Sequence, residues 1–280
     1  MPLQDTRTHA LPSVRPSLIA VIDLRRHAGR GFLRATSHAG RFTALVLELF
    51  RGLAEWRVWL PRTVEQAQNI GYGSLPIVLL IAGFGGAVTA LQSGYQLEGG
   101  FVPLYYAGGV VTSGVILELG PVLTALILAG RIGARYAAEL GTLRVTEQID
   151  ALESLGRSPV THLLLPRIIS GILVIPALTV IANATGIASG YFASATALGL
   201  NWGDFTYGAR YFFKGPFDLW YSLIKAYFFS LAVTVIPCYI GYNTQQGAEG
   251  VGRATTTAVV AASITILLLD TTLAKVLLGQ

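Results

Sequence analysis

The sequence predicts an all-α integral membrane protein with five transmembrane helices. Hydrophobic residues make up 52% of the chain and charged residues only 12%, whereas ordinary soluble domains carry roughly 25% charged residues. The charges are also clustered, so that long uncharged stretches remain between them. A transmembrane helix needs about 20 mainly apolar residues. No charge occurs in residues 66–97, 99–117, 119–130, 168–203 and 226–248, and several of these stretches reach that length.

Arginine is concentrated at the start of the chain. Of the 20 Lys and Arg residues, ten lie in residues 1–62, and all ten are Arg. Five more lie between Arg131 and Arg167. Basic residues beside transmembrane helices mark the cytoplasmic side, so we expect both regions to be cytoplasmic. An arginine-rich tail for nucleic acid is the alternative, but the membrane spans already explain the asymmetry, and we expect no nucleic-acid partner.

The N-terminal part divides into a basic segment and an amphipathic helix. Residues 1–37 are polar and contain several prolines, which predicts a poorly ordered cytoplasmic segment. Residues 38–60 place apolar side chains at helical spacing with Arg and Glu between them. This pattern is typical of a helix that lies in the membrane interface rather than across it. Pro61 is expected to end this helix, and residues 38–280 are expected to form one membrane domain after the basic segment.

The five spans are predicted at about 72–93, 104–130, 168–200, 217–240 and 255–278. Gly83, Gly85 and Gly86 in the first span, and small residues at every fourth position from Ala125 to Gly141 in and after the second, predict close helix packing. The third span is long enough to tilt, bend or protrude, and a hairpin there would invert every later loop. Residues 201–221 are rich in aromatic residues and read as an outer interfacial belt. Residues 241–254, with Arg253, read as a cytoplasmic loop. An odd number of spans places the N-terminus inside and the C-terminus outside.

A short charged helix is predicted between the second and third spans, over about residues 146–156. Thr146 is a favourable N-cap, and acidic residues in the first turn suit the helix dipole. A helix this short is marginal alone, so we expect a soluble partner to hold it, although an ordinary solvated connector is the alternative. The residues expected to contact that partner are Glu147, Ile149, Asp150, Leu152, Glu153 and Leu155.

Residues 113–167 resemble the signature region of the MlaE/YrbE permeases, the membrane subunits of ABC transporters that move lipids with MCE-domain proteins. The matching pieces are Glu118-Leu119-Gly120-Pro121, Ala129-Gly130-Arg131, Ala138-Glu139-Leu140-Gly141, Thr146-Glu147-Gln148, Pro166-Arg167, Leu223-Ile224-Lys225, Gly241-Tyr242 and Gly252-Arg253-Ala254-Thr255. The resemblance covers roughly residues 40–280. It implies a homodimer in the bacterial inner membrane, a cytoplasmic ABC ATPase bound to the short helix, and an MCE-domain lipid-binding protein outside.

Two charges are expected deep inside the spans, Glu118 and Lys225. A charge at that depth is expensive unless it faces a cavity or a partner. Pro121 should kink the helix beside Glu118. The resemblance implies that both residues lie near the lipid cavity; Leu97 and Phe101 are further candidates for apolar lipid contacts at the outer mouth of the first span. The alternatives are that Lys225 snorkels to the headgroups and that Glu118 only braces the kink.

Other classes of protein are less compatible with the sequence. The single cysteine, Cys238, excludes an internal disulfide, the four His residues lack ligand spacing, and no glycine-rich phosphate-binding loop is present. We therefore expect no catalytic site, cofactor or metal in this chain, and no cleaved signal peptide. The alternative function is a secondary transporter or channel that is not coupled to ATP; the odd span count and the lack of an obvious inverted repeat argue against it.

Overall fold

The computed structural model describes residues 40–97, 102–245 and 247–279. The chain divides into two units, residues 1–48 and 49–280, and the packing described below concerns the second. The described residues form helices and no strand. Five helices are long and apolar enough to cross a membrane: Trp56–Leu97, Tyr106–Val145, Val160–Ala197, Pro216–Tyr242 and Gly247–Leu278. The predicted all-α membrane fold with five spans is confirmed.

The predicted interfacial helix is shorter than expected and does not end at Pro61. A helix covers residues 40–52, and a turn follows at residues 53–55. The indole of Trp59 donates to the Leu53 carbonyl (3.3 Å) across that turn. α2 (Trp56–Leu97) then begins, and Pro61 lies inside it. Proline near the start of a helix removes only one hydrogen bond, and the apolar run of α2 continues through it.

The second span is continuous but contains two π-helical turns. It comprises α3 (Tyr106–Gly114), η1 (Val115–Leu119), α4 (Gly120–Leu128), η2 (Ala129–Gly133) and α5 (Ala134–Val145). The short helix α6 (Gln148–Ser154) follows. The third span is a single helix, formed by η3 (Val160–Leu164) and α7 (Leu165–Ala197), so the hairpin alternative is wrong. It ends near α8 (Trp202–Phe212), which lies within the predicted aromatic belt.

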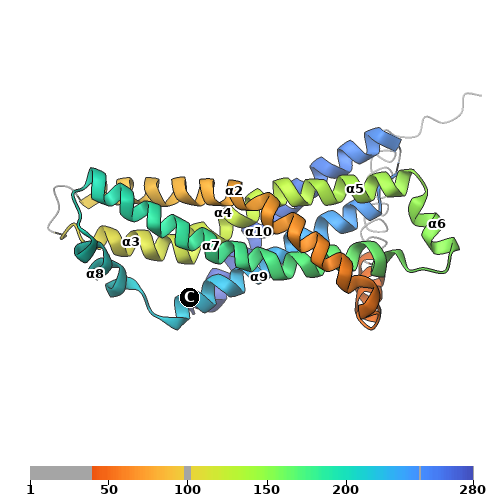
Figure 1. The fold of residues 1–280 in the computed structure, drawn as a ribbon, viewed down its shortest axis with the longest axis horizontal. Helices are drawn as coiled ribbons and strands as arrows, with labels where there is room; N and C mark the ends of the chain where they lie inside the picture. The colour runs from red at the N-terminus through yellow and green to blue at the C-terminus, as the bar shows by residue number, and fades with distance from the viewer. Residues whose placement is uncertain (1–39, 98–101, 246, 280) are drawn as a thin grey trace, which may run out of the picture. The chain divides into compact units, whose positions relative to one another are not determined.

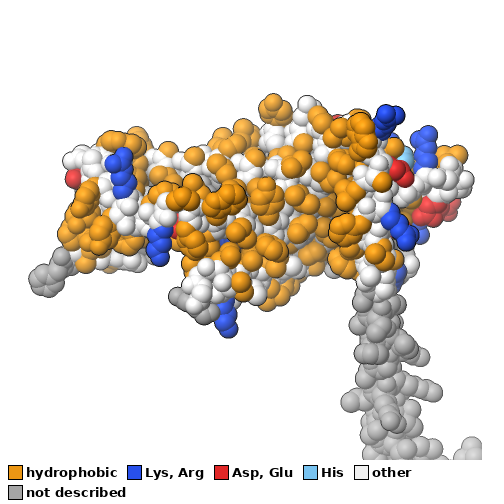
Figure 2. Space-filling model, turned by 90° about the horizontal axis from the view of Figure 1, so that it is seen from below, with side chains coloured by type: hydrophobic (Ala, Val, Ile, Leu, Met, Phe, Trp, Pro, Cys, Tyr) orange, Lys and Arg blue, Asp and Glu red, His pale blue; other side chains and the backbone are white. Residues whose placement is uncertain are grey.

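The last two spans are α9 (Pro216–Tyr242) and α10 (Gly247–Leu278). α10 begins eight residues earlier than predicted, so Arg253 lies in its first turns rather than in a loop. In Figure 1, α2 and α7 run side by side, α8 lies at one end of the bundle and α6 at the other. Hydrophobic side chains cover most of the face seen in Figure 2, and charged side chains gather at the α6 end. This distribution fits a bundle whose middle is surrounded by lipid.

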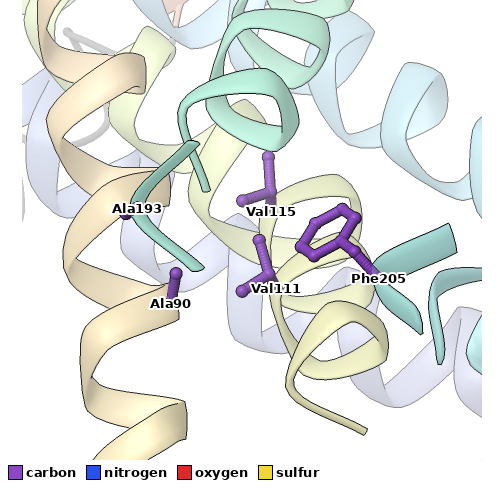
Figure 3. Packing of buried hydrophobic residues seen from close by; sticks show 5 residues of the cluster. All are labelled: Ala90, Val111, Val115, Ala193 and Phe205. Atoms are coloured by element: carbon purple, nitrogen blue, oxygen red, sulfur yellow. The ribbon is translucent and has the colours of Figure 1, made fainter. Parts of the chain in front are cut away.

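Small residues bring the helices together, as predicted. A Cβ on Gly86 would lie 1.8 Å from the Gly186 carbonyl oxygen, so α2 and α7 touch through their backbones. A Cβ on Gly241 would lie 2.8 Å from the Ala137 carbonyl oxygen, so α9 and α5 also approach closely. Close to the α8 end, a compact apolar core joins four helices (Figure 3); its members are Ala90, Val111, Val115, Ala193 and Phe205.

Candidate functional site

Three charged side chains from three spans meet inside the bundle. The Lys225 ammonium on α9 lies 2.7 Å from Glu118 Oε2 on η1 and 2.6 Å from Asp270 Oδ1 on α10. The Lys225 side chain is fully buried, that of Asp270 is 15% exposed and that of Glu118 is 50% exposed. We call Glu118, Lys225 and Asp270 the charged triad. Each of the three residues lies roughly 12–18 Å from one end of its transmembrane span, counted at 1.5 Å per residue. That end is the one on the α8 side of the bundle.

The backbone beside Glu118 supplies a further ligand for the ammonium. Pro121 has no N–H, so it cannot donate to the carbonyl of Leu117, four residues earlier. That carbonyl accepts a hydrogen bond from Lys225 Nζ at 3.2 Å. The irregularity predicted from Pro121 appears as the π-helical turn η1 directly before it. Glu118 therefore provides a carboxylate to the ammonium, and Pro121 leaves the Leu117 carbonyl available to bind the same group.

Lys225 does not snorkel, so that alternative is wrong. Its ammonium is held inside the bundle by two carboxylates and a carbonyl, and it also lies 5.0 Å from the centre of the Tyr221 ring. Glu118 does more than brace a kink, because it bonds to a different helix. One cation between two carboxylates leaves a formal excess of one negative charge. The half-exposed Glu118 carboxylate is the most accessible member of the triad.

A second polar contact lies next to the triad. The Asn183 amide on α7 donates to the Ser222 hydroxyl at 2.9 Å, and Ser222 lies one helical turn before Lys225. A Cβ on Gly120 would lie 1.6 Å from Asn183 Oδ1, so glycine is needed there for the contact between α4 and α7. Asn183 Oδ1 is buried and has no hydrogen-bond partner among the described residues. The second, third and fourth spans thus share one polar layer inside an apolar bundle.

Asp270 was not predicted from the sequence, which indicated only Glu118 and Lys225 as charges deep inside the spans. The expectation of only two such charges is wrong, because Asp270 is a third. The signal was present, because Asp270 follows three leucines in the last span and has no other charge within four residues on either side. Its partner Lys225 is on another helix, 45 residues earlier in the chain, so no local pattern indicates the pairing.

The short helix α6 is anchored to the bundle at the other end. Ile149 is fully buried, Asp150 pairs with Arg144 of α5 (2.5 Å), and Glu153 accepts a hydrogen bond from the Tyr242 hydroxyl of α9 (3.2 Å). Two other predicted contact residues remain on the surface: Leu155 is 74% exposed, and Glu147 is exposed as well. Leu152 is half-buried.

The start of α6 differs from the prediction. Glu147, rather than Thr146, precedes the first helical residue, with a left-handed backbone (φ 59°) and no side-chain cap. Thr146 instead donates from its hydroxyl to the Thr142 carbonyl at the end of α5 (2.8 Å). A non-glycine residue with positive φ is uncommon. The sharp turn at Glu147 makes α6 a separate element after α5.

Two of the segments that resemble the MlaE/YrbE permeases, residues 138–141 and 166–167, meet between the second and third spans. Glu139 binds Arg135 at 2.6 Å and Arg167 of α7 at 3.0 Å. The Arg167 guanidinium is mostly buried and lies 5.6 Å from the centre of the Tyr136 ring. This network ties α5 to α7 next to the segment that carries α6.

The model of the family described as Permease MlaE matches residues 63–276. The chain belongs to the MlaE permease family. A probable ABC transporter permease protein of Rickettsia bellii is 37% identical, over 89% of this chain and 95% of that protein. The intermembrane phospholipid transport system permease protein MlaE of Haemophilus influenzae is 35% identical, over 89% of this chain and 94% of that protein. Protein TRIGALACTOSYLDIACYLGLYCEROL 1 of Arabidopsis thaliana is 35% identical, over 81% of this chain and 63% of that protein.

The MlaE match includes the charged triad and α6 but not residues 1–62. Leu97, the remaining described candidate for a lipid contact, ends α2 and does not lie near the triad. Neighbouring Gly94 packs on Leu198, whereas Gly120 packs on Asn183. Asn183 in α7 and Leu198 directly after α7 are about four helical turns apart, or roughly 22 Å. Leu97 is therefore far from the triad along the bundle. Phe101 lies outside the described residues.

No group of three or more His, Cys, Asp or Glu side chains that could hold a metal ion occurs within residues 40–97, 102–245 and 247–279. Cys238 is free and buried. The candidate site of this MlaE permease therefore consists of a charged triad in the bundle and a docked helix at its end.

Proposed function

We propose that this chain is the membrane subunit of an ABC transporter that moves phospholipid or another lipid between the inner membrane and an MCE-domain protein. A separate cytoplasmic polypeptide would bind and hydrolyse ATP, and this chain would not be an enzyme by itself. Membership of the MlaE family and the printed function of the Haemophilus influenzae relative support the proposal. The main structural support is the charged triad, a polar centre inside an otherwise apolar bundle.

The triad suits a molecule that has both an apolar and a polar part. The surrounding spans are apolar and would accommodate acyl chains. The half-exposed Glu118 carboxylate would meet the polar part of the lipid, while Lys225 and Asp270 hold it in position from the buried side. Because the ammonium is already neutralised by two carboxylates, an anionic phosphate would bind it only when one carboxylate moves away. Lipid movement would therefore involve a rearrangement of these ion pairs.

The energy would enter through α6. The exposed residues that flank it, Glu147 and Leu155, would contact the ATPase. Buried Ile149, the ion pair of Asp150 with α5 and the hydrogen bond of Glu153 with α9 would transmit the movement to the bundle. A second copy of the chain would complete the transporter. α2 and α10 are the least buried of the five spans and offer the largest apolar surface for that copy.

The test is a lipid-transfer assay with the chain in phospholipid vesicles, with and without its co-purified ATPase. Lipid transfer that needs both ATP and the ATPase is the expected result. Transfer or ion flux driven by an ion gradient in the absence of ATP would contradict the proposal and would favour a secondary transporter or channel.

A further inference from the structure

An apolar cavity of about 400 Å³ lies between α7, α8 and α3, at the end of the bundle opposite α6. Two walls follow the helical spacing of one face. The first consists of Ala184, Ile187, Ala188 and Tyr191 on α7, and the second of Trp202, Phe205, Thr206 and Ala209 on α8. Thr112 of α3 completes the lining. Faces with this spacing normally pack on each other. Here Tyr191 packs edge to face on Trp202 (4.8 Å between ring centres) and on Phe205 (5.4 Å), and a space remains beside these contacts.

The contact between α8 and α3 keeps this space open. A Cβ on Gly208 of α8 would lie 1.9 Å from the Tyr105 carbonyl oxygen, and a Cβ on Gly108 of α3 would lie 2.4 Å from the Phe205 carbonyl oxygen. The backbones of α3 and α8 therefore touch, and α8 cannot shift toward α7 without losing this contact. The small side chains of Ala184, Ala188 and Ala209 do not fill the remaining distance.

The Thr hydroxyls in the cavity walls already have hydrogen-bond partners and do not need water. The Thr112 hydroxyl donates to the Gly108 carbonyl (2.8 Å) and the Thr206 hydroxyl to the Trp202 carbonyl (2.8 Å), each within its own helix. Phe205 is shared with the apolar core of Figure 3, so the inner wall is continuous with packed hydrophobic side chains. An apolar cavity of this kind favours an apolar occupant over water. Its volume is within the range of about 300–1,000 Å³ that is typical of ligand pockets.

The position and the charges of α8 indicate what kind of molecule the cavity binds. Trp202, Tyr207 and Tyr211 are exposed on α8, and exposed Trp and Tyr are typical of the membrane–water interface. Arg210 and Lys214 are exposed at the end of α8. Within the described part of the chain, neither side chain forms an ion pair with a carboxylate. Arg210 directly follows the lining residue Ala209, and Lys214 lies two residues after the end of α8, whereas the acidic Asp204 is in the first turn of the helix. The positive charge at this end of α8 complements an anionic lipid.

We propose that this cavity binds one acyl chain of an anionic phospholipid from the membrane leaflet on the α8 side, with its phosphate at Arg210 and Lys214. The bound lipid would fill the space between α7 and α8 and stabilise α8 on the bundle. This site is separate from the charged triad, because Ala184 is exposed whereas the adjacent Asn183 faces the buried polar layer. A second copy of the chain is a less suitable occupant, since α7 is the most buried span and α2 and α10 are the least.

The test uses the full chain in vesicles of phosphatidylcholine and phosphatidylglycerol that contain phosphatidylglycerol with a photoreactive acyl chain. After illumination, mass spectrometry should find adducts on residues 184–191 and 202–209. Ala188→Phe should reduce these adducts several-fold by filling the cavity, and Ala209→Leu should do so from the other wall. Val180→Phe is the matched control, because Val180 is exposed on α7 but does not line the cavity. Adducts on exposed residues of α2 should stay unchanged in every variant and show that the chain is folded.

The charge requirement is tested with Arg210→Gln and Lys214→Gln together, which should remove the preference for photoreactive phosphatidylglycerol over photoreactive phosphatidylcholine. Equal labelling of the cavity in the wild type and in Ala188→Phe would overturn the proposal. So would protection of the cavity after assembly with partner proteins, since a partner helix would then be the occupant. Labelling by both lipids alike in the wild type would contradict the assignment of an anionic headgroup.

Discussion

Asp270 and Lys225 form an ion pair of 2.6 Å between α10 and α9, inside a bundle of apolar helices. Lys225 bonds at the same time to Glu118 at 2.7 Å, so a single ammonium connects the second, fourth and fifth spans. Removing one partner of a buried ion pair leaves an uncompensated charge, which typically destabilises a protein by about 3–5 kcal/mol. The triad is thus a structural connection and a polar centre at once, and variants must separate these two roles.

Lys225→Met should destabilise the chain strongly, because it leaves two carboxylates close together without a cation. The expected loss is about 3–5 kcal/mol, measured as a lower unfolding temperature in detergent. Lys225→Met combined with Asp270→Leu should regain most of the stability, since the half-exposed Glu118 is then the only charge left at the site. If the double variant is less stable than Lys225→Met alone, the two residues do not act as a pair.

Leu155→Asp should abolish binding of the ATPase while the permease stays folded in the membrane. Leu155 is 74% exposed, so the substitution disturbs no contact inside the chain. Co-purification and ATP hydrolysis measure the effect, and Leu278→Asp, at an exposed leucine near the C-terminus, is the matched control. Ile149→Asp differs, because it should detach α6 from the bundle and lower stability. Unchanged ATPase binding by Leu155→Asp would show that the partner contacts another surface.

Gly86→Ala should push α2 away from α7 and destabilise the bundle. The new Cβ would lie 1.8 Å from the Gly186 carbonyl oxygen, and a backbone atom cannot move aside as a flexible side chain can. Gly130→Ala is the matched control in another span, since its Cβ has no atom within 4 Å. That control should be neutral or stabilising by up to about 1 kcal/mol, because Ala is the better helix former. Equal unfolding temperatures of both variants would argue against the close contact.

Single cysteines at position 41 and position 278 should react with membrane-impermeable reagents from opposite sides. Arg41 belongs to the basic N-terminal region, which we expect in the cytoplasm, and five spans separate it from Leu278. The native Cys238 is fully buried and should not interfere. Labelling of both positions from the same side would contradict the proposed topology.

Hydropathy predicted the five spans because each needs only a long apolar run, which is a local property. The contacts between spans could not be predicted in the same way. Asp270 stands in an apolar run like any isolated charge, and only the folded chain shows that it shares Lys225 with Glu118. The apolar stripe of α6 was recognised from its spacing. That spacing could not show that Ile149 is buried against this chain while Leu155 remains exposed.

Local backbone geometry also limited the prediction. The pattern of residues 38–60 suits a single amphipathic helix, but the turn at residues 53–55 divides it. The left-handed conformation of Glu147 moved the start of α6 beyond Thr146, because nothing in the residue types around it favours positive φ. Pro121, by contrast, was informative, because the loss of its N–H has a fixed consequence for the carbonyl of Leu117.

Passage of lipid along the charged triad is tested with a photoreactive residue at position 118. The assembled transporter carrying this residue is illuminated in phospholipid vesicles, and Glu118→Gln is assayed in parallel for lipid transfer. We expect a phospholipid adduct at position 118, and reduced transfer by Glu118→Gln with its ATPase still bound. No adduct together with wild-type transfer by Glu118→Gln would contradict it, and the triad would then only hold the spans together.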